Sequence, residues 1–265
     1  MTHIEPVALI TGASRGIGKA IVQKLSRQGL SCICVASSKE SISHICLGDH
    51  LSVTRKHQRH RSLAVDLARW PQWLSQKSYP GIDYLPLIQE GFFPLLDTRS
   101  WGVEQADVQY RLSLLVNCAG TTQSSISLRT DPLEAQRIMN INFMSSISMC
   151  NSTIRSMIRS RTDSSFPLQI INVSSVLGAS DLAIPGTSVY TASKAALSHY
   201  TKVLAQEILP LGIRVASICP GLVSKTDMIK GLDQSAQTKL KEIMKSKVST
   251  PEEIASQVWA IYSRH

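Results

Sequence analysis

VALITGASRGIGKAIVQKL, residues 7–25, joins an apolar, strand-like segment to an amphipathic helical segment through a glycine-rich turn. Glycines allow a tight turn and a close approach of the backbone to a pyrophosphate, whose charge the N-terminus of the following helix stabilises. The spacing is TGxxxGxG rather than GxGxxG. A glycine cluster between a buried strand and a helix is the context that a dinucleotide site requires. We assign the following residues to this cofactor-binding turn: Gly12, Ser14, Arg15, Gly16, Ile17 and Gly18.

The rest of the chain repeats this alternation of strand and helix. Strand-like apolar runs lie at 7–11, 31–36, 62–66, 114–120, 169–175 and 214–221, and helical patterns lie at 18–28, 133–158 and 192–208. Near-continuous hydrophobicity is typical of parallel strands that are buried on both faces. The sequence therefore predicts an α/β fold, a doubly wound (Rossmann-type) parallel sheet, in a single domain that spans residues 1–265.

Composition limits the function classes. The 265 residues are 43% hydrophobic and 18% charged, which suits one domain with a sizeable core. No apolar run approaches the roughly 20 residues that span a bilayer, and the first strand leaves no room for a signal peptide. The six cysteines show neither CxxC spacing nor metal-type clustering. We expect no membrane span, no metal site and a reducing compartment, either the cytosol or an organelle matrix.

The net charge of +9 favours acidic partners or anionic ligands. Its densest run is RKHQRHR, residues 55–61. No aromatic residue interleaves with this run, so we interpret it as a solvated loop rather than a nucleic-acid-binding arm.

One segment interrupts the alternation. Residues 67–116 separate the third strand from the fourth, whereas a whole βαβ unit takes roughly 30 residues. We predict an insertion at about 70–111, with local structure of its own. A second segment, about 222–250, contains six lysines. The spacing of its apolar residues is typical of an amphipathic helix whose lysines face the solvent.

The end of the second strand distinguishes the two nicotinamide cofactors. NAD sites place a carboxylate there to bind the ribose 2′-hydroxyl. Here the positions hold Ser37, Ser38 and Lys39, and only Glu40, one or two residues late, is acidic. Hydroxyls and a cation suit a 2′-phosphate, to which Arg15 can add a bidentate contact. The sequence therefore favours NADPH.

Two further strand ends offer polar or small residues to a ligand. Asp66, after the third strand, either accepts a hydrogen bond from adenine or caps a helix. Asn117, Ala119 and Gly120 end the fourth strand, and ligands of open α/β sheets bind at such carboxyl ends. We predict that all four residues contribute to the cofactor site.

Tyr190 and Lys194, in SVYTASKAAL (188–197), are four residues apart. On a helix they share one face at a separation of about 6 Å. Taken alone, the pair is better explained by a tyrosine ring that packs over a lysine stem on a half-exposed helix.

The motifs together resemble the short-chain dehydrogenase/reductase family. TGASRGIG matches the family's cofactor loop, and Tyr190-Thr-Ala-Ser-Lys194 matches its YxxxK motif. NCAG (117–120) matches the family's NNAG strand end, with Cys118 in place of an asparagine. The resemblance covers nearly the whole chain. It implies that Tyr190 and Lys194 are a catalytic pair that also contacts the cofactor.

The resemblance extends to three more segments. NVSS supplies the family's serine at Ser175, and MNINF supplies its helix asparagine at Asn142. CPG (219–221), followed by Thr226, matches the PG…T segment that contacts the nicotinamide amide, with one extra residue in between. On this basis we assign four more residues to the cofactor site: Pro220, Gly221, Val223 and Thr226.

The resemblance implies a mechanism of carbonyl reduction. Tyr190 is the general acid, and Lys194 lowers the pKa of its phenol and holds the ribose hydroxyls. Ser175 donates a hydrogen bond to the substrate carbonyl and stabilises developing oxyanion charge. Asn142 anchors, through its backbone, a water that resupplies the proton. All four residues are present, which predicts an active enzyme.

Within the family, PGLVSKTDM and TPEEIASQVWAIYS are similar to segments of 3-oxoacyl-[acyl-carrier-protein] reductases, and WPQWL and PGTSVYTASKAALS resemble the fungal mitochondrial member. This implies NADPH-dependent reduction of a 3-oxoacyl group on acyl carrier protein, in type II fatty-acid synthesis, in mitochondria. It also implies that residues 222–250 close over the substrate. The alternatives are a reductase of another ketone and a cofactor-binding regulatory subunit.

The chain departs from the family's pattern at two places. Bacterial relatives dock carrier protein with two arginines, and Arg159 or Arg161 can fill one of these roles, whereas Gln206 occupies the second position. A solvated helix face that carries Arg155, Arg159 and Arg161 explains these arginines equally well. The sequence stops after a last helical segment, where relatives continue into a seventh strand that builds a tetramer. We therefore predict six strands and a homo-oligomer that is a dimer rather than a tetramer.

Overall fold

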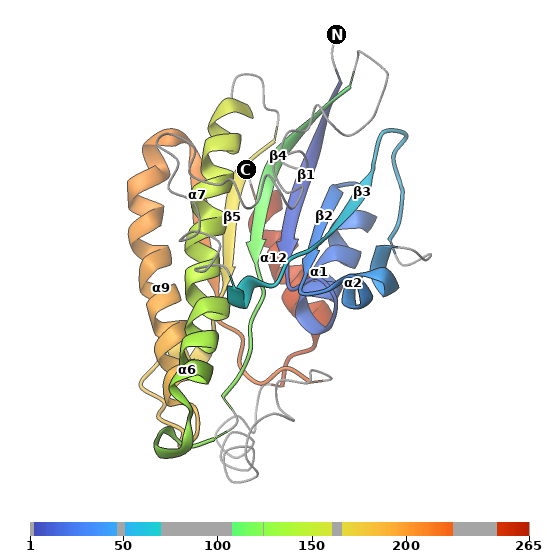
Figure 1. The fold of residues 1–265 in the computed structure, drawn as a ribbon. Coiled ribbons are helices and arrows are strands. Elements are labelled where there is room, and N and C mark those ends of the chain that lie inside the picture. The colour runs from blue at the N-terminus through green and yellow to red at the C-terminus, as the bar shows by residue number, and fades with distance from the viewer. Residues whose placement is uncertain are drawn as a thin grey trace, which may run out of the picture.

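Six parallel strands form the central sheet of the protein (Figure 1). The computed structural model describes residues 3–46, 51–69, 108–123, 125–160, 166–224 and 248–264. The strand order is β3-β2-β1-β4-β5-β6, and each neighbouring pair is parallel. The strands are β1 (His3–Thr11), β2 (Ser31–Ala36), β3 (His60–Ala64), β4 (Val108–Asn117), β5 (Leu168–Val173) and β6 (Ile213–Ile218). This confirms the predicted doubly wound sheet of six strands.

Helices cover both faces of the sheet (Figure 1). Within the described ranges they are α1 (Gly16–Arg27), α2 (Lys39–Cys46), α6 (Pro132–Met139), α7 (Ser145–Ser160), α8 (Val176–Ala179), α9 (Ser188–Ile208) and α12 (Pro251–Ser263). Short 3₁₀ turns are η1 (Leu67–Arg69), η3 (Ser127–Arg129) and η6 (Leu209–Leu211). No helix in these ranges is long and apolar enough to cross a membrane.

The sheet separates two apolar cores, which explains why its strands read as near-continuous hydrophobic runs. Val7 and Leu9 of β1 pack in the core that also contains residues of α7 and α9. Ala8 and Ile10 point the other way, into the core formed with α1 and α12. Because successive side chains of a strand alternate between faces, a strand with helices on both sides must be apolar at nearly every position.

The strand order reverses beside β1. From β1 the chain continues through β2 and β3 on one side, and β4 then pairs with β1 on its other side. Ligands of open α/β sheets bind in the crevice outside the carboxyl ends of the strands at such a reversal. The topology therefore points to the carboxyl ends of β1 and β4 as the place for a site.

Several predicted boundaries are corrected. The fourth strand begins at Val108 rather than near residue 114, because Val108–Arg111 pair with His3–Pro6 of β1. Residues 108–111 are therefore strand and not insertion, and the rest of the insertion, 70–107, lies outside the described residues. The helix predicted over 133–158 is divided by a π-helical turn, η4 (Asn140–Met144).

The predicted substrate-covering segment is described only at its two ends. Val223 forms an isolated parallel bridge with Ser249, while residues 225–247 lie outside the described ranges. Helix α12 then begins with a capping box, in which the Thr250 side chain accepts from the Glu253 backbone and the Glu253 side chain accepts in return.

Candidate active site

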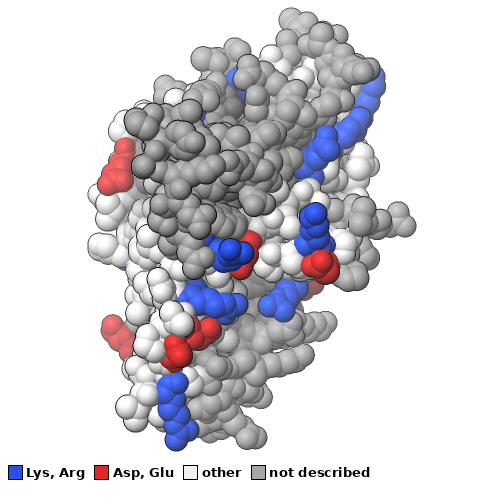
Figure 2. Space-filling model, in the orientation of Figure 1, with Lys and Arg blue, Asp and Glu red and all other residues white. Residues whose placement is uncertain are grey.

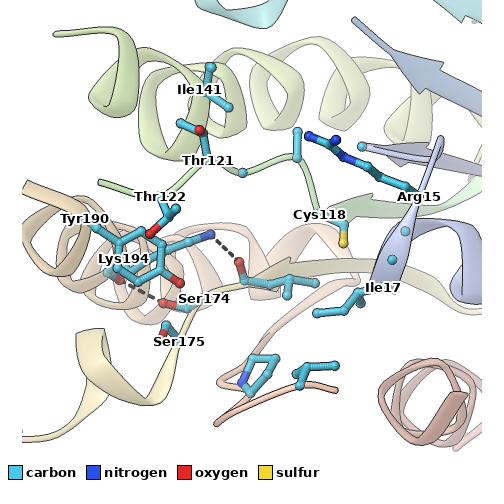
Figure 3. A pocket seen from close by; sticks show the side chains of 18 of the residues that line it. Arg15, Ile17, Cys118, Thr121, Thr122, Ile141, Ser174, Ser175, Tyr190 and Lys194 are labelled. Atoms are coloured by element: carbon cyan, nitrogen blue, oxygen red, sulfur yellow. Dashed lines mark hydrogen bonds between the residues drawn. The ribbon is translucent and has the colours of Figure 1, made fainter. Parts of the chain in front are cut away.

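A cavity of about 470 Å³ opens at the carboxyl edge of the sheet (Figure 3). Its walls come from the loops that follow all six strands and from the first two turns of α9. Figure 3 shows Tyr190, Lys194, Ser174 and Ser175 grouped on one side of the cavity, with Arg15 and Ile17 across from them. The following predicted residues line it: Gly12, Ser14, Arg15, Gly16, Ile17, Gly18, Ser37, Asp66, Ala119, Gly120, Ser175, Tyr190, Lys194, Pro220, Gly221 and Val223.

The glycine turn fits a pyrophosphate for steric reasons. Gly12 has a φ of 67°, and a Cβ there would lie 2.8 Å from the Cα of Ala119. A Cβ on Gly18 would overlap the carbonyl of Gly12, so helix α1 packs against the turn only because position 18 is a glycine. Arg15, the N-cap of α1, provides no side-chain cap, and the first turn of the helix contains no acidic residue. The amide groups at this helix end therefore suit an anion.

The end of β2 contributes one of the three residues that we predicted there. Ser37 lines the cavity. Ser38 and Lys39 do not, because Ser38 exchanges hydrogen bonds with Ser41 and Lys39 begins helix α2. Glu40 also lies outside the cavity wall, and hydrogen bonds from the backbone and from Ser38 lower the pKa of its exposed carboxyl.

Asp66 makes the hydrogen bond of a helix cap and also lines the cavity, while its contact with adenine stays a prediction. One carboxylate oxygen accepts a hydrogen bond of 3.0 Å from the backbone of Ala68, at the start of η1. The same residue lines the cavity.

Asn117 is another predicted residue that the structure places outside the cavity wall. Its side chain is buried beneath the cavity, where Nδ2 donates to Asn172 Oδ1 at 2.8 Å and to Cys150 Sγ at 3.5 Å. Its neighbour Cys118 lines the cavity instead, because side chains at a strand end alternate in direction. Burial raises the pKa of the Cys118 thiol to about 12, which keeps it protonated.

Asn142 holds the loop that follows β4 by hydrogen bonds from its side chain. It lies fully buried in the π-helical turn η4, where its Oδ1 accepts from Thr121 N at 2.8 Å and its Nδ2 donates to Thr121 O at 3.0 Å. Nδ2 also donates to Ser193 Oγ of α9 at 2.9 Å. Its side chain is therefore used for holding η4, the loop and α9 together, and it does not form part of the cavity wall.

The N-terminal turns of two helices bring Ser175, Tyr190 and Lys194 to one wall of the cavity. Ser175 is the N-cap of α8 and accepts from Leu177 N at 3.2 Å. Tyr190 and Lys194 lie in the first two turns of α9 and are 7% and 3% exposed. Helix α8 packs against this part of α9 so closely that a Cβ on Gly178 would overlap the backbone of Lys194.

Burial dominates the electrostatics of this group. It raises the pKa of the Tyr190 phenol, and a hydrogen bond with Ser175 opposes this only in part. It lowers the pKa of Lys194 to about 8, and Nζ donates to the carbonyl oxygen of Val173 at 2.9 Å. The family resemblance implies that Lys194 lowers the pKa of Tyr190, but desolvation of the phenolate raises this pKa here. At neutral pH Tyr190 is protonated and Lys194 is mostly charged.

The segment after β6 completes the cavity. Pro220, Gly221, Leu222 and Val223 line it, and Pro220 O accepts from Val176 N at 2.9 Å. Thr226, the last predicted residue of this segment, lies outside the described residues.

Some residues of the cavity wall were not predicted. Thr121 and Thr122 continue the loop after β4, while Arg137 and Ile141 face the cavity from α6 and η4. Position in a loop after a strand end could have indicated the two threonines. Arg137 and Ile141 are four residues apart, which is the ordinary spacing of residues on one helix face. This spacing therefore does not indicate that they line a cavity.

A glycine-rich turn that meets a Ser–Tyr–Lys group at the carboxyl edge of a doubly wound sheet defines the short-chain dehydrogenases. The family model described as short chain dehydrogenase matches residues 6–73 and 101–237, and the chain belongs to this family. It is therefore an oxidoreductase of the class that uses a nicotinamide cofactor.

Several individual proteins are similar to this chain over nearly its whole length. The 3-oxoacyl-[acyl-carrier-protein] reductase FabG of Vibrio cholerae is 30% identical over 255 residues, which cover 95% of this chain and 87% of the relative. Carbonyl reductase family member 4 of Danio rerio is 26% identical, over 94% of this chain and 87% of its own. The structure of 4-hydroxyisoleucine dehydrogenase complexed with NADH shares the fold, with a TM-score of 0.73, 19% identity and coverage of 98% and 91% of the two chains.

Proposed function

We propose that the protein catalyses the NADPH-dependent reduction of a 3-oxoacyl thioester, carried by acyl carrier protein, to the 3-hydroxyacyl thioester of type II fatty-acid synthesis. The observation that carries this proposal is that the glycine turn and the Ser175–Tyr190–Lys194 group face each other across the same cavity. The substrate class is supported by the names of the relatives at about 30% identity.

The side chains at the cavity wall suit the reduction of a carbonyl. Tyr190 holds its proton at neutral pH, because burial raises the phenol pKa, and it donates that proton to the carbonyl oxygen. Ser175 stabilises the negative charge that develops on the same oxygen by a hydrogen bond. The charged Lys194 lies one helical turn away and stabilises the phenolate that remains. The bound cofactor supplies the hydride.

NADPH is favoured over NADH by the residues at the end of β2. The position that directly follows the strand and lines the cavity is Ser37, an uncharged hydroxyl. Arg15 lines the same cavity, and a guanidinium can bind a phosphate through two parallel hydrogen bonds. Glu40, which could bind a ribose hydroxyl, is exposed on α2 and outside the cavity wall.

The partner, the compartment and the assembly are part of the same proposal. Carrier proteins are acidic, and the net charge of +9 favours their encounter with this protein. Figure 2 shows basic side chains at several separate places on one face, some with acidic side chains beside them. We place the protein in mitochondria on the strength of its resemblance to the fungal mitochondrial member of the family. We propose a homodimer that pairs through the family interface formed by the long helices that carry Asn142 and Tyr190.

A second candidate is the reduction of another ketone. It is supported by the relative from Danio rerio, which is named a carbonyl reductase and aligns with 94% of this chain.

One assay tests both candidates. NADPH absorbance is followed with acetoacetyl-carrier protein, acetoacetyl-coenzyme A and a free ketone, each repeated with NADH. We expect rapid oxidation of NADPH only, with the carrier-protein thioester as the preferred substrate. A preference for the free ketone would favour the second candidate. No turnover with any substrate, despite NADPH binding in a fluorescence titration, would reject both.

A further inference from the structure

Gln123 lies in the loop after β4, three residues beyond Gly120 of the cavity wall, and its side chain is fully buried. A buried amide is costly unless its donors and its acceptor are all paired. Here the two N–H groups of Nε2 are shared among three acceptors, Ser125 O at 2.7 Å, Thr130 Oγ1 at 3.0 Å and Ser188 Oγ at 3.3 Å. The remaining group, Oε1, accepts from the first turn of α9.

Oε1 of Gln123 replaces the cap that α9 does not provide for itself. The first N–H groups of a helix have no intrahelical partner. Thr187, the N-cap, uses its hydroxyl to donate to Ile184 O at 2.7 Å and makes no side-chain cap. Instead, Gln123 Oε1 accepts from Val189 N at 2.7 Å and from Tyr190 N at 3.4 Å. The residue whose amide is held in this way is the proton donor of the proposed reaction.

The orientation of the amide follows from its partners. The backbone N–H groups of Val189 and Tyr190 can only donate, so the atom that faces them must be the oxygen. Ser125 O can only accept, so the atom that faces it must be the nitrogen. No other assignment of the two amide atoms satisfies both sides.

The same loop is held at its other end by Asn142. That side chain pairs with both backbone groups of Thr121 and reaches Ser193 Oγ, which in turn donates to Tyr190 O at 2.6 Å. The backbone N–H and C=O of Tyr190 are thus linked, through Gln123 and through Ser193, to one loop. Thr121 and Thr122 of that loop line the cavity.

We propose that Gln123 is a positioning residue, which fixes the depth and rotation of the first turn of α9 so that the Tyr190 phenol meets the substrate carbonyl. This inference rests on the proposed function of Tyr190 as the proton donor. Small displacements matter at this point, since a misplacement of about 1 Å can lower a rate by about two orders of magnitude.

The chain offers a matched control in Gln58. This glutamine is also fully buried, and its Nε2 donates to Ser26 O at 2.8 Å and to Leu30 O at 2.9 Å. Its Oε1 accepts from the backbone and the hydroxyl of Thr54. Gln58 lies in the loop before β3 and is not part of the cavity wall. Replacement of either glutamine by methionine removes a buried amide with similar partners.

The experiment compares Gln123→Met and Gln58→Met in the full-length protein. Both are expected to lower the midpoint of urea unfolding by a similar amount. Only Gln123→Met should lower kcat for acetoacetyl thioester, by about tenfold or more, while the Kd of NADPH from fluorescence stays within about twofold. Hydrogen exchange of a peptide that contains Val189 and Tyr190 should accelerate by about tenfold in Gln123→Met only.

The outcomes separate this inference from the proposed function. Equal losses of kcat in the two variants, or unchanged exchange at Val189 and Tyr190 in Gln123→Met, would overturn the positioning role. A parallel rise in the NADPH Kd would also overturn it, because Gln123 would then act on the cofactor site. If the wild-type protein reduces no thioester, the proposed function fails, while the exchange experiment still tests the cap.

Discussion

Lys194 is a buried cation, and we expect that replacing it stabilises the fold while it abolishes activity. The side chain is 3% exposed, and burial is the main cause that lowers its pKa from 10.5 to about 8. At pH 7 the native protein therefore carries a charge that the unfolded chain would hydrate better. Lys194→Met removes this charge and keeps an unbranched side chain of similar length.

The magnitude follows from the pKa. The difference between 10.5 and about 8 corresponds to about 3 kcal/mol of unfavourable burial at pH 7. The substitution also leaves the carbonyl of Val173 without the hydrogen bond from Nζ, which costs about 1 kcal/mol. The variant should therefore be about 2 kcal/mol more stable than the wild type at pH 7.

The sign of the pH dependence is fixed by proton binding. Between pH 8 and pH 10.5 the unfolded lysine binds a proton that the native lysine has lost, so the stability of the wild type rises with pH through this group. The variant lacks that rise. Its advantage should therefore be full below pH 8 and disappear by about pH 10.

Urea unfolding of both proteins at pH 7 and pH 10 measures this difference. Lys202→Met, an exposed position on the same helix, is the control, and its effect should be small at both pH values. A Lys194→Met variant that is less stable than the wild type at pH 7, or a difference that does not change with pH, would refute the argument that the charge is buried at a cost.

Two other substitutions test the site directly, each beside a matched control. Tyr190→Phe should abolish reduction while NADPH binding stays within a few-fold, and near-normal turnover of this variant would contradict the acid role. Tyr110→Phe, which loses a partly buried hydrogen bond to His57 O, should keep its turnover. Ser37→Asp should shift the kcat/KM preference from NADPH towards NADH by about tenfold or more, because a carboxylate there repels a 2′-phosphate. Ser43→Asp, on α2 and outside the cavity wall, should leave the preference unchanged, and an equal shift in both variants would argue against a local effect.

The fold could be predicted from the sequence because burial on both faces leaves a plain signal. Strand β2 has the predicted bounds, 31–36, since all six of its residues are buried. The start of β4 was missed because Val108–Arg111 are not uniformly apolar, and they are strand only through pairing with the first residues of β1. Such pairing is a contact between distant segments, and local periodicity does not reveal it.

The site could be predicted as a set of residues but not as a set of orientations. The motif that ends β4 does not reveal that the Asn117 side chain points into the core while Cys118 faces the cavity. The motif that contains Asn142 does not reveal that the hydrogen bonds of its side chain go to Thr121 and Ser193. The direction of the Tyr190 pKa was mistaken for the same reason, because the degree of burial depends on packing that no motif states.

Stability and geometry are supplied by different parts of this molecule. The two cores on either side of the sheet are apolar, whereas the residues that hold the first turn of α9 are buried amides and hydroxyls. Burial of an amide gains little free energy, since its hydrogen bonds replace those with water. The five contacts of Gln123 and the three of Asn142 therefore determine position more than they determine unfolding free energy. Substitutions at these two residues should reduce kcat more than their effect on stability would suggest, whereas substitutions in the cores should do the opposite.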